Sequence, residues 1–387
     1  MHLQILAALS KCISTAGMVV RPLPHRWVFF LPVVAINSYC YFSKVSDDSI
    51  RSNVIIETLI ASDYILLTDI QRELRQIGQR EPIINAGIWD RLKWTLQLLC
   101  SPRGIGWTHE QTSIIPPHAH LSRLDFLRNR LIALVMAIIG NDIAFILTSI
   151  DPGFSRDAVT YYEQPFLWRF WATGLFFFRL KSSIQVYLLL ITLLLVSTGL
   201  SEPDTWPDFF GRLADAYTVR RWWGYESTLF LGPRFLTKYS RRVWHQQLRR
   251  IVSSHGKFLS RHVFGLLPGT IASSYAQLYV AFFLSGLIHV TSFDPRPICF
   301  FLLQAVTITF EDFIISVARK AGAQSSFAVQ ILGYVWVYCS LTVTFGIWLD
   351  SMNSAGIGDY AGTLILNRYH GSWLSNESLP LRGNPEA

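Results

Sequence analysis

The chain has 387 residues, of which 51% are hydrophobic and only 16% are charged, and its mean hydropathy is +0.31. A soluble globular protein carries about 25% charged residues, so this composition predicts an integral membrane protein. The aromatic content of 14%, with 13 Trp, is typical of chains whose rings lie at membrane–water boundaries. The net charge of +8 would suit nucleic-acid binding only if a soluble domain carried a basic face, and none is visible.

The sequence lacks the short motifs of several enzyme classes. It has no nucleotide-binding glycine loop, no GxSxG nucleophile elbow and no HExxH zinc motif, so ATPase, hydrolase and metalloprotease functions are not supported. The five cysteines show neither CxxC nor Cys/His metal spacing, which argues against a disulfide framework or a zinc site. They are Cys12, Cys40, Cys100, Cys299 and Cys339. No small-residue cleavage site marks a signal peptide, so we expect the first apolar run to be a retained span.

Apolar segments recur along the chain and predict an all-α, polytopic membrane protein, because about 20 apolar residues can cross a membrane as a helix. The candidates are residues 3–20, Trp27–Phe42, Val54–Ile70, Leu131–Ile150, Phe166–Leu180, Ile184–Leu200, Ser274–Phe293, Pro297–Ala318 and Phe327–Leu349. The two segments within 166–200 supply one or two spans. Val54–Ile70 contains Glu57 and Asp63, so it either spans with these carboxylates turned inward or lies on the membrane surface. We therefore expect about eight spans. No internal repeat stands out, so residues 1–387 are predicted to form one polytopic domain.

The long polar segment at residues 201–261 holds most of the positive charge. It contains 11 Lys or Arg against 5 Asp or Glu. Positive charge favours the cytosolic side of a membrane, and the interleaved Trp and Tyr favour amphipathic helices lying on that surface.

Two pairs of polar residues fall inside predicted spans. Asn141 and Asp142 are expected to form interhelical hydrogen bonds rather than to act in catalysis. Glu311 and Asp312 are neighbours on a helix and point about 100° apart. They cannot form a shared carboxylate pair, so we expect them to satisfy buried donors.

The span Ser274–Phe293 has no Asp, Glu, Lys or Arg and carries one histidine, His289. On a helix Ser285 and His289 share a face, and Gly286 lets a second helix or a ligand approach closely. An ionisable group inside a membrane is a functional candidate, and an imidazole with a pKa near 6.5 suits proton abstraction from an alcohol. The alternative is a packed, hydrogen-bonded histidine without a catalytic role.

A second constellation lies in the basic segment. It comprises Trp244, His245, Gln246 and Arg249, preceded by the RRWWG turn at 220–224 with Arg221 and Trp223. On a helix His245 and Arg249 share a face. The arginines could bind the phosphates of a soluble cofactor; the alternative is attraction to anionic lipid headgroups, worth about 1 kcal/mol per residue.

Several motifs, taken in order, resemble one family. They are RGIGW (Arg103–Trp107), RRWWG, WHQQLRR, SGLIH, QAVTITFED (Gln304–Asp312) and GYVWV (Gly333–Val337). This order is similar to that of wax synthase-like proteins in the membrane-bound O-acyltransferase superfamily. More narrowly, the chain resembles fungal members that acetylate terpenoid and meroterpenoid secondary metabolites. The resemblance covers about residues 101–349; relatives lack the stretch Tyr225–Val243 between the WG and WHQ elements.

The resemblance implies transfer of an acyl group from acyl-CoA to an alcohol inside the endoplasmic reticulum membrane, with CoA entering from the cytosol. His289 matches the family's membrane histidine, which acts as general base, and His245 matches a second polar position that orients donor or acceptor. The CoA- or substrate-binding candidates are Trp244, Gln246, Arg249, Ser285, Gly286, Arg221 and Trp223. The expected co-substrates are acetyl-CoA and a hydrophobic alcohol, with no metal, no bound cofactor and no nucleic-acid partner.

Two other functions stay open. A long-chain wax or sterol ester synthase would share the motifs and differ in the acyl donor. A transporter or lipid-binding membrane protein would use its polar intramembrane residues to line a pathway, although the inverted repeats frequent in transporters are not visible.

Overall fold

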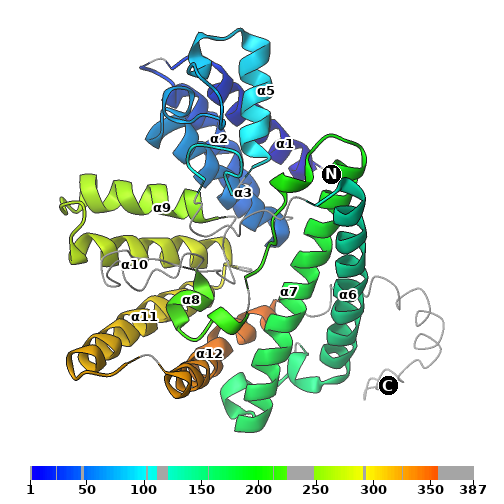
Figure 1. Cartoon of the computed structure of the whole chain (residues 1–387), viewed down its shortest axis with the longest axis vertical. Helices are drawn as coiled ribbons and strands as arrows, with labels where there is room; N and C mark the ends of the chain where they lie inside the picture. The colour runs from blue at the N-terminus through cyan, green and yellow to red at the C-terminus, as the bar shows by residue number, and fades with distance from the viewer. Residues whose placement is uncertain are drawn as a thin grey trace, which may run out of the picture. The chain divides into compact units, whose positions relative to one another are not determined.

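The computed structural model in Figure 1 describes residues 2–22, 24–44, 48–101, 103–110, 121–155, 157–211, 213–224, 248–290, 293–324 and 326–355. The chain divides into two compact units. Unit 1 comprises Met1–His118 and Phe210–Ser351, and unit 2 comprises Ala119–Phe209 and Met352–Ala387. The single polytopic domain stays a prediction. Within the described ranges the regular structure is helical, and one isolated bridge joins Gln76 to Trp107.

The N-terminal part of unit 1 is a helical bundle. Helix α1 (His2–Val19) packs on α2 (Trp27–Phe42), α3 (Asp48–Ala61) and α5 (Ile88–Leu99). Helix α3 continues into a π-helical turn, η1 (Ser62–Leu67), before the short helix α4 (Ile70–Glu73). The apolar side chains of these elements form one core, with Met18, Val33, Ile70 and Leu98 inaccessible to solvent. This burial stabilises a bundle whose helices are individually short.

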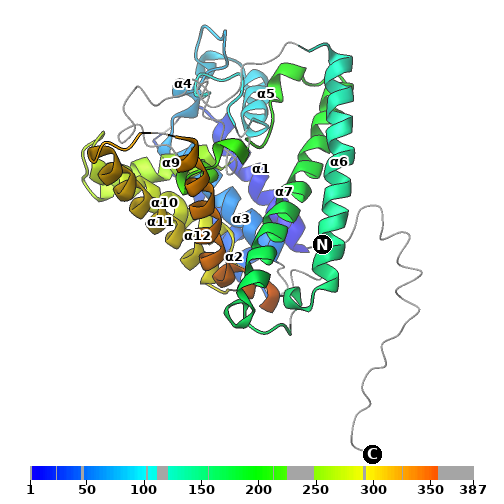
Figure 2. The ribbon, with the colours of Figure 1, turned by 60° about the horizontal axis from the view of Figure 1, so that its bottom comes forward.

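The C-terminal part of unit 1 contains the predicted site. Helix α9 (Arg249–Phe258) ends in a π-helical turn (Leu259–Val263) and packs against α10 (Ile271–Ile288), which packs against α11 (Arg296–Lys320). Figures 1 and 2 show α9, α10 and α11 side by side. The short α8 (Val219–Trp223) contacts α11. Helix α12 (Phe327–Ser354) follows α11 along the chain.

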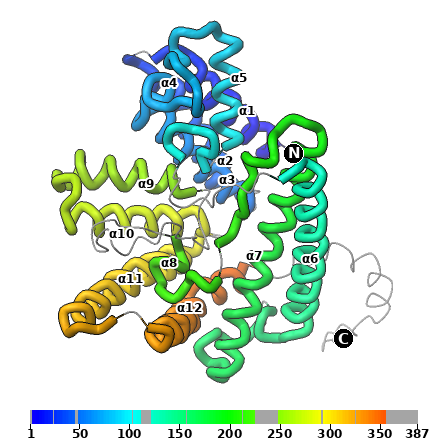
Figure 3. The backbone as a smooth tube through the Cα atoms, in the orientation of Figure 1, coloured from blue at the N-terminus to red at the C-terminus, as the bar shows by residue number. Residues whose placement is uncertain are grey.

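Unit 2 is built on two long helices, α6 (Arg123–Ile150) and α7 (Phe166–Ser197), which lie side by side (Figure 3). The hydroxyl of Ser183 on α7 donates to Asn141 Oδ1 on α6 (2.6 Å), and Asn141 Nδ2 donates to Asp142 (3.4 Å). The expectation of an interhelical hydrogen bond at this pair is confirmed.

The described residues contain five helices that are long and apolar enough to span a membrane: α6, α7, α10, α11 and α12. The count of about eight spans is not confirmed. The segments Phe166–Leu180 and Ile184–Leu200 form one helix of 32 residues, because the polar residues between them do not interrupt its hydrogen bonding. Trp27–Phe42 is a helix with the predicted bounds but is shorter than a typical span. Val54–Ile70 is divided between α3, η1 and α4, and Asp63 is buried, as the first of the two alternatives for this segment predicts.

Candidate active site

Helix α10 carries the candidate base, His289, at its C-terminal end rather than in its middle. The helix begins after Thr270, whose hydroxyl accepts a backbone N–H of the first turn, and it ends at Ile288. The sequence predicted a span that continued to Phe293, and this boundary is wrong. The chain leaves the helical conformation after Ile288, and the next helix, α11, begins at Arg296 directly after Pro295. His289 therefore lies where two predicted spans meet.

The imidazole of His289 is oriented by the backbone of its own helix. Its Nδ1 lies 2.7 Å from the carbonyl oxygen of Ser285, one turn earlier. Because a carbonyl oxygen can only accept, Nδ1 carries the proton and Nε2 holds the basic lone pair. The Ser285 hydroxyl itself donates to the carbonyl of Ala281 (2.9 Å), within the same helix. The arrangement makes Nε2 the nitrogen that can take up a proton.

Gly286, another predicted site residue, serves the packing of two helices. A Cβ at this position would lie 2.6 Å from the Cα of Ile298, in the first turn of α11. Only a glycine permits so close an approach of two backbones. The sequence predicted that a helix or a ligand would use this space, and the structure fills it with a helix.

Aromatic side chains from two other helices form a wall against the imidazole. The ring of Phe301 on α11 lies 4.9 Å from the His289 ring between centroids, and that of Trp348 on α12 lies 5.2 Å away, nearly perpendicular. Phe301 and Trp348 also contact each other (5.4 Å). Phe301 is inaccessible to solvent and Trp348 is 5% exposed, so water is excluded from this side of the imidazole.

Trp223, from the RRWWG turn, belongs to the same aromatic cluster. Its ring centroid lies 5.6 Å from that of Phe301, so one phenyl ring joins the predicted residues Trp223 and His289. Its indole N–H donates to Gln304 Oε1 (3.1 Å), and Gln304 in turn donates to the hydroxyl of Thr344 on α12 (2.8 Å). These bonds hold α8, α11 and α12 together beside the candidate base.

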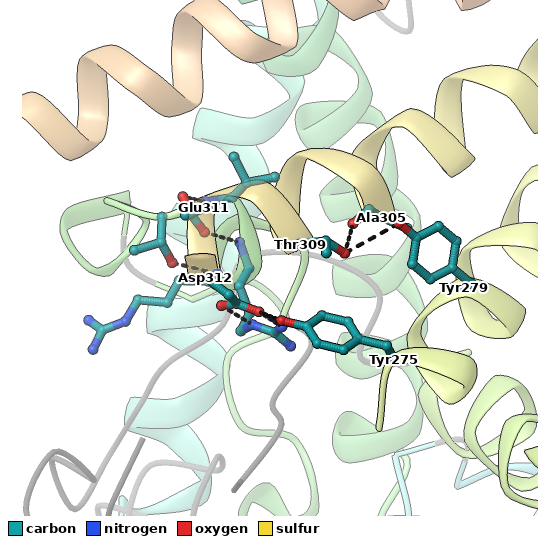
Figure 4. A network of polar contacts seen from close by, with 10 residues as sticks. Tyr275, Tyr279, Ala305, Thr309, Glu311 and Asp312 are labelled. Carbon is teal, nitrogen blue, oxygen red and sulfur yellow. Dashed lines mark hydrogen bonds and ion pairs between the residues drawn. The ribbon is translucent and has the colours of Figure 1, made fainter. Parts of the chain in front are cut away.

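Two acidic residues of α11 anchor the turn that carries Trp223, as Figure 4 shows. Glu311 accepts the backbone N–H groups of Val219 (2.8 Å) and Arg220 (3.3 Å), the unpaired donors at the start of α8. Asp312 accepts from the guanidinium of Arg220, through Nε (3.2 Å) and Nη2, and from the hydroxyl of Tyr275 (3.1 Å) on α10. The expectation that both carboxylates satisfy buried donors is confirmed.

The two other arginines of the prediction lie outside these clusters of contacts. The guanidinium of Arg221 stacks on the ring of Tyr217 at 4.2 Å, a cation–π contact within its own turn. Arg249 is the first residue of α9.

The residue after Arg249 is part of a buried ionic cluster. Arg250 Nε lies 3.3 Å from Oδ2 of Asp63, a fully buried carboxylate in η1, and the same carboxylate accepts the hydroxyl of Thr68 (2.7 Å). The guanidinium also lies 5.2 Å from the centre of the Tyr64 ring. This ion pair ties the start of α9, and with it the end of the WHQQLRR motif, to the N-terminal bundle.

The RGIGW loop contacts His109, which lies close enough to Arg250 to feel its charge. Gly104 has φ +65°, and a Cβ there would lie 2.6 Å from Nε2 of His109; glycine meets both constraints. Burial, together with the positive charge of Arg250, lowers the pKa of His109 to about 4. His109 is therefore uncharged at neutral pH.

Trp244, His245 and Gln246 lie outside the described residues, as does the stretch Tyr225–Val243. Within the described ranges, no three His, Cys, Asp or Glu side chains come together as metal ligands would.

Sequence reasoning missed the aromatic partners of His289 and the ionic partner of the WHQQLRR motif. Phe301 and Trp348 lie 12 and 59 positions after the histidine and have no sequence signal beyond being apolar residues of predicted spans. Asp63 did have a signal, because a carboxylate in an apolar run needs a partner if it is buried. Nothing in the sequence indicated that Arg250 is that partner.

Comparisons with known proteins show to which family the chain belongs. The profile described as "Membrane bound O-acyl transferase family" matches residues 236–295, which include both candidate histidines. The acetyltransferase ple2 of Rhodocybe pseudopiperita is 32% identical over 387 aligned residues, covering 95% of this chain and 96% of the relative. The acetyltransferase eriL of Hericium erinaceus is 31% identical over 362 residues, covering 89% and 90%. No solved structure matches the chain.

The long apolar helices and these matches define an integral membrane enzyme that transfers acyl groups. The chain belongs to the membrane-bound O-acyltransferase family. Within that family it groups with acetyltransferases of fungi, including a more distant one, sirH of Leptosphaeria maculans, at 24% identity over 71% of this chain and 68% of the relative.

Proposed function

We propose that this enzyme moves an acetyl group from acetyl-CoA to a hydroxyl of a hydrophobic terpenoid or meroterpenoid intermediate in secondary-metabolite biosynthesis. The observation that carries the proposal is the orientation of His289, whose Nδ1 proton is held by the Ser285 carbonyl at 2.7 Å. That orientation leaves proton uptake to Nε2. The acetyl donor is supported by relatives named acetyltransferases that align over nearly the whole chain.

In the proposed reaction Nε2 of His289 takes the proton from the acceptor hydroxyl as its oxygen attacks the thioester carbonyl. The tetrahedral intermediate collapses by breaking the carbon–sulfur bond, and the imidazolium returns the proton to the CoA thiolate. The products are the acetate ester and CoA. The Ser285 carbonyl stabilises the transient imidazolium through the Nδ1–H bond, and no acyl-enzyme is needed.

The roles of the other predicted residues are parts of the same proposal. His245 orients donor or acceptor, and it or a backbone N–H stabilises the oxyanion. Trp244, Gln246, Arg249 and Arg221 bind CoA. Trp223 acts through the aromatic wall, because its ring contacts that of Phe301.

Ser285 and Gly286 shape the site by orienting His289 and by admitting α11. The enzyme works in the endoplasmic reticulum membrane, with CoA entering from the cytosol. The excess of Lys and Arg in residues 201–261 supports that orientation.

The decisive experiment uses the full-length protein in detergent or microsomes, with labelled acetyl-CoA and hydrophobic alcohols such as farnesol, geranylgeraniol and ergosterol. Replacing His289 by Ala should lower kcat by about 10²- to 10⁴-fold, the usual contribution of general base catalysis. His262→Ala, at an exposed histidine, is the matched control and should retain activity. Near-wild-type turnover in His289→Ala protein would remove this residue from the mechanism.

The same assay separates the proposal from a long-chain ester synthase. Acetyl-CoA and palmitoyl-CoA are offered together at equal concentration with one alcohol, and the two esters are quantified. A predominance of the palmitoyl ester would replace the acetyl donor by a long-chain one.

A further inference from the structure

Phe293, which lies shortly before α11, has an unusual backbone conformation. Phe293 has φ +64°, and it is the only non-glycine residue with positive φ among those the structure describes. A bulky residue rarely adopts this region, because its Cβ approaches the backbone too closely. Such strain persists only where the surroundings impose it, and it is concentrated at functional sites.

The ring of Phe293 is held by three side chains of the N-terminal bundle. It stacks on Phe42 with the ring planes 7° apart and the centroids at 6.0 Å. Tyr41 meets it edge-on at 5.5 Å, and the guanidinium of Arg51 lies 4.7 Å from its centre. We call Tyr41, Phe42 and Phe293 the aromatic platform.

Hydrogen bonds fix the turn on both sides of Phe293. Before it, the hydroxyl of Ser52 on α3 donates to the carbonyl of Ile288 (2.8 Å). After it, Asp294 accepts the backbone N–H of Arg296 (2.9 Å) and its guanidinium Nε (2.6 Å). The surroundings therefore impose the strained conformation.

The platform differs in exposure from the wall on the other side of the site. Phe301 is inaccessible to solvent, whereas Phe293 is 47% exposed and Phe42 is 69% exposed. Phe293 follows His289 by four residues, a chain length that reaches at most about 14 Å. An exposed aromatic surface thus lies within the reach of a multi-ring molecule whose hydroxyl is placed at the imidazole.

We propose that the aromatic platform binds the hydrophobic body of the acceptor alcohol and thereby presents its hydroxyl to His289. This inference rests on the proposed function, and it names the part of the protein that selects the acceptor. A flat, fused-ring body would lie against the exposed faces of Phe42 and Phe293. The alternative is that these residues anchor the protein at the membrane–water interface, as other exposed aromatic rings of membrane proteins do. The positive φ of Phe293 favours the binding role, because backbone strain of this kind is concentrated at functional sites rather than at interfacial anchors.

The first test needs no turnover. The full-length protein is irradiated with a diazirine-bearing farnesol, and the labelled peptides are mapped with and without excess unlabelled farnesol or acetyl-CoA. Label on peptides containing Tyr41–Phe42 or Phe293, competed by farnesol and not by acetyl-CoA, supports the platform. Absence of competed label from both peptides overturns it.

The second test separates binding from anchoring. Phe42→Ala and Phe293→Ala should each raise KM for the acceptor at least tenfold while KM for acetyl-CoA changes less than twofold. Phe293→Gly relieves the strained backbone and should show the same loss, whereas Phe293→Tyr should restore binding. The matched control is Phe283→Ala, at a ring on α10 that is 43% exposed, and it should leave both KM values unchanged. Equal losses for both substrates, or none, would assign the platform to anchoring.

The outcomes also distinguish this inference from the proposed function. Competed labelling without any acetyl transfer would retain the platform and reject the acetyltransferase proposal. Acetyl transfer without competed labelling would do the reverse, and absence of both would reject both.

Discussion

Helices α10 and α11 support two regions of opposite character. Around His289 the contacts are aromatic, with Phe301 and Trp348 packed against the imidazole. Near the start of α10, Tyr275 joins an ionic network with Asp312 and Arg220. Tyr275 and His289 are 14 residues apart, about 21 Å along a helix.

This difference indicates that the two regions have different roles. In the aromatic region the titratable ring of His289 packs against the rings of Phe301 and Trp348. In the ionic network every named charge is neutralised by a partner, so it stabilises the fold and offers no reactive group. Substitutions should therefore separate, with activity lost in one region and stability lost in the other.

The largest expected effect on stability is in the ionic network. Asp312→Ala leaves the guanidinium of Arg220 without its carboxylate in a nearly buried site, where the loss of one partner costs about 3–5 kcal/mol. The free energy of unfolding is measured in detergent by denaturant titration. Glu202→Gln is the control, because its ion pair with Arg123 is exposed and is worth about 1 kcal/mol or less. Equal losses in the two variants would contradict the assignment.

A smaller loss is expected where α10 and α11 touch. Gly286→Ala places a Cβ 2.6 Å from the Cα of Ile298. The two backbones must separate, which costs about 1–3 kcal/mol, as overpacking does. The control is Gly140→Ala in α6, where a Cβ would meet the ends of the Phe178 and Ser182 side chains at 3.1 and 3.4 Å rather than a backbone. If Gly286→Ala protein melts at the wild-type temperature, the packing role is wrong.

The smallest expected effect tests a third region, the ionic cluster around Arg250. The pKa of His109 is lowered to about 4 in the folded state, below the ordinary 6.5. The stability contribution of the neutral ring is therefore complete above pH 6.5 and is lost as the pH falls towards 4. At pH 5 the loss is on the order of 1–2 kcal/mol, allowing for the partial exposure of the ring.

Unfolding at pH 7.5 and pH 5.0 should therefore differ less in His109→Asn protein than in the wild type. His262→Asn, at an exposed histidine, should behave like the wild type. An unchanged pH dependence in His109→Asn protein would show that another group titrates in this range.

Much of the architecture could be predicted, because a membrane-spanning helix is recognisable from the hydropathy of its own residues. Trp27–Phe42 has the predicted bounds, and α11 and α12 contain the predicted spans Pro297–Ala318 and Phe327–Leu349. The roles of Glu311 and Asp312 followed from their adjacent positions on one helix.

The rest depends on contacts between elements far apart in the sequence. Periodicity places Trp348 on a helix, yet it carries no information on which ring of another helix it will contact. The end of α10 was predicted too late, because the apolar sequence continues to Phe293 whereas the helix ends at Ile288. Hydropathy indicates which residues are excluded from water, whereas the residue at which a helix ends depends on the backbone conformation.

The group that orients His289 is a main-chain carbonyl rather than a carboxylate side chain. A substitution of the side chain at position 285 leaves that carbonyl in place, so the protonation of Nδ1 does not depend on which residue stands there. The tautomer of His289 is therefore set by the path of the main chain, which every residue type at position 285 except proline can reproduce in a helix.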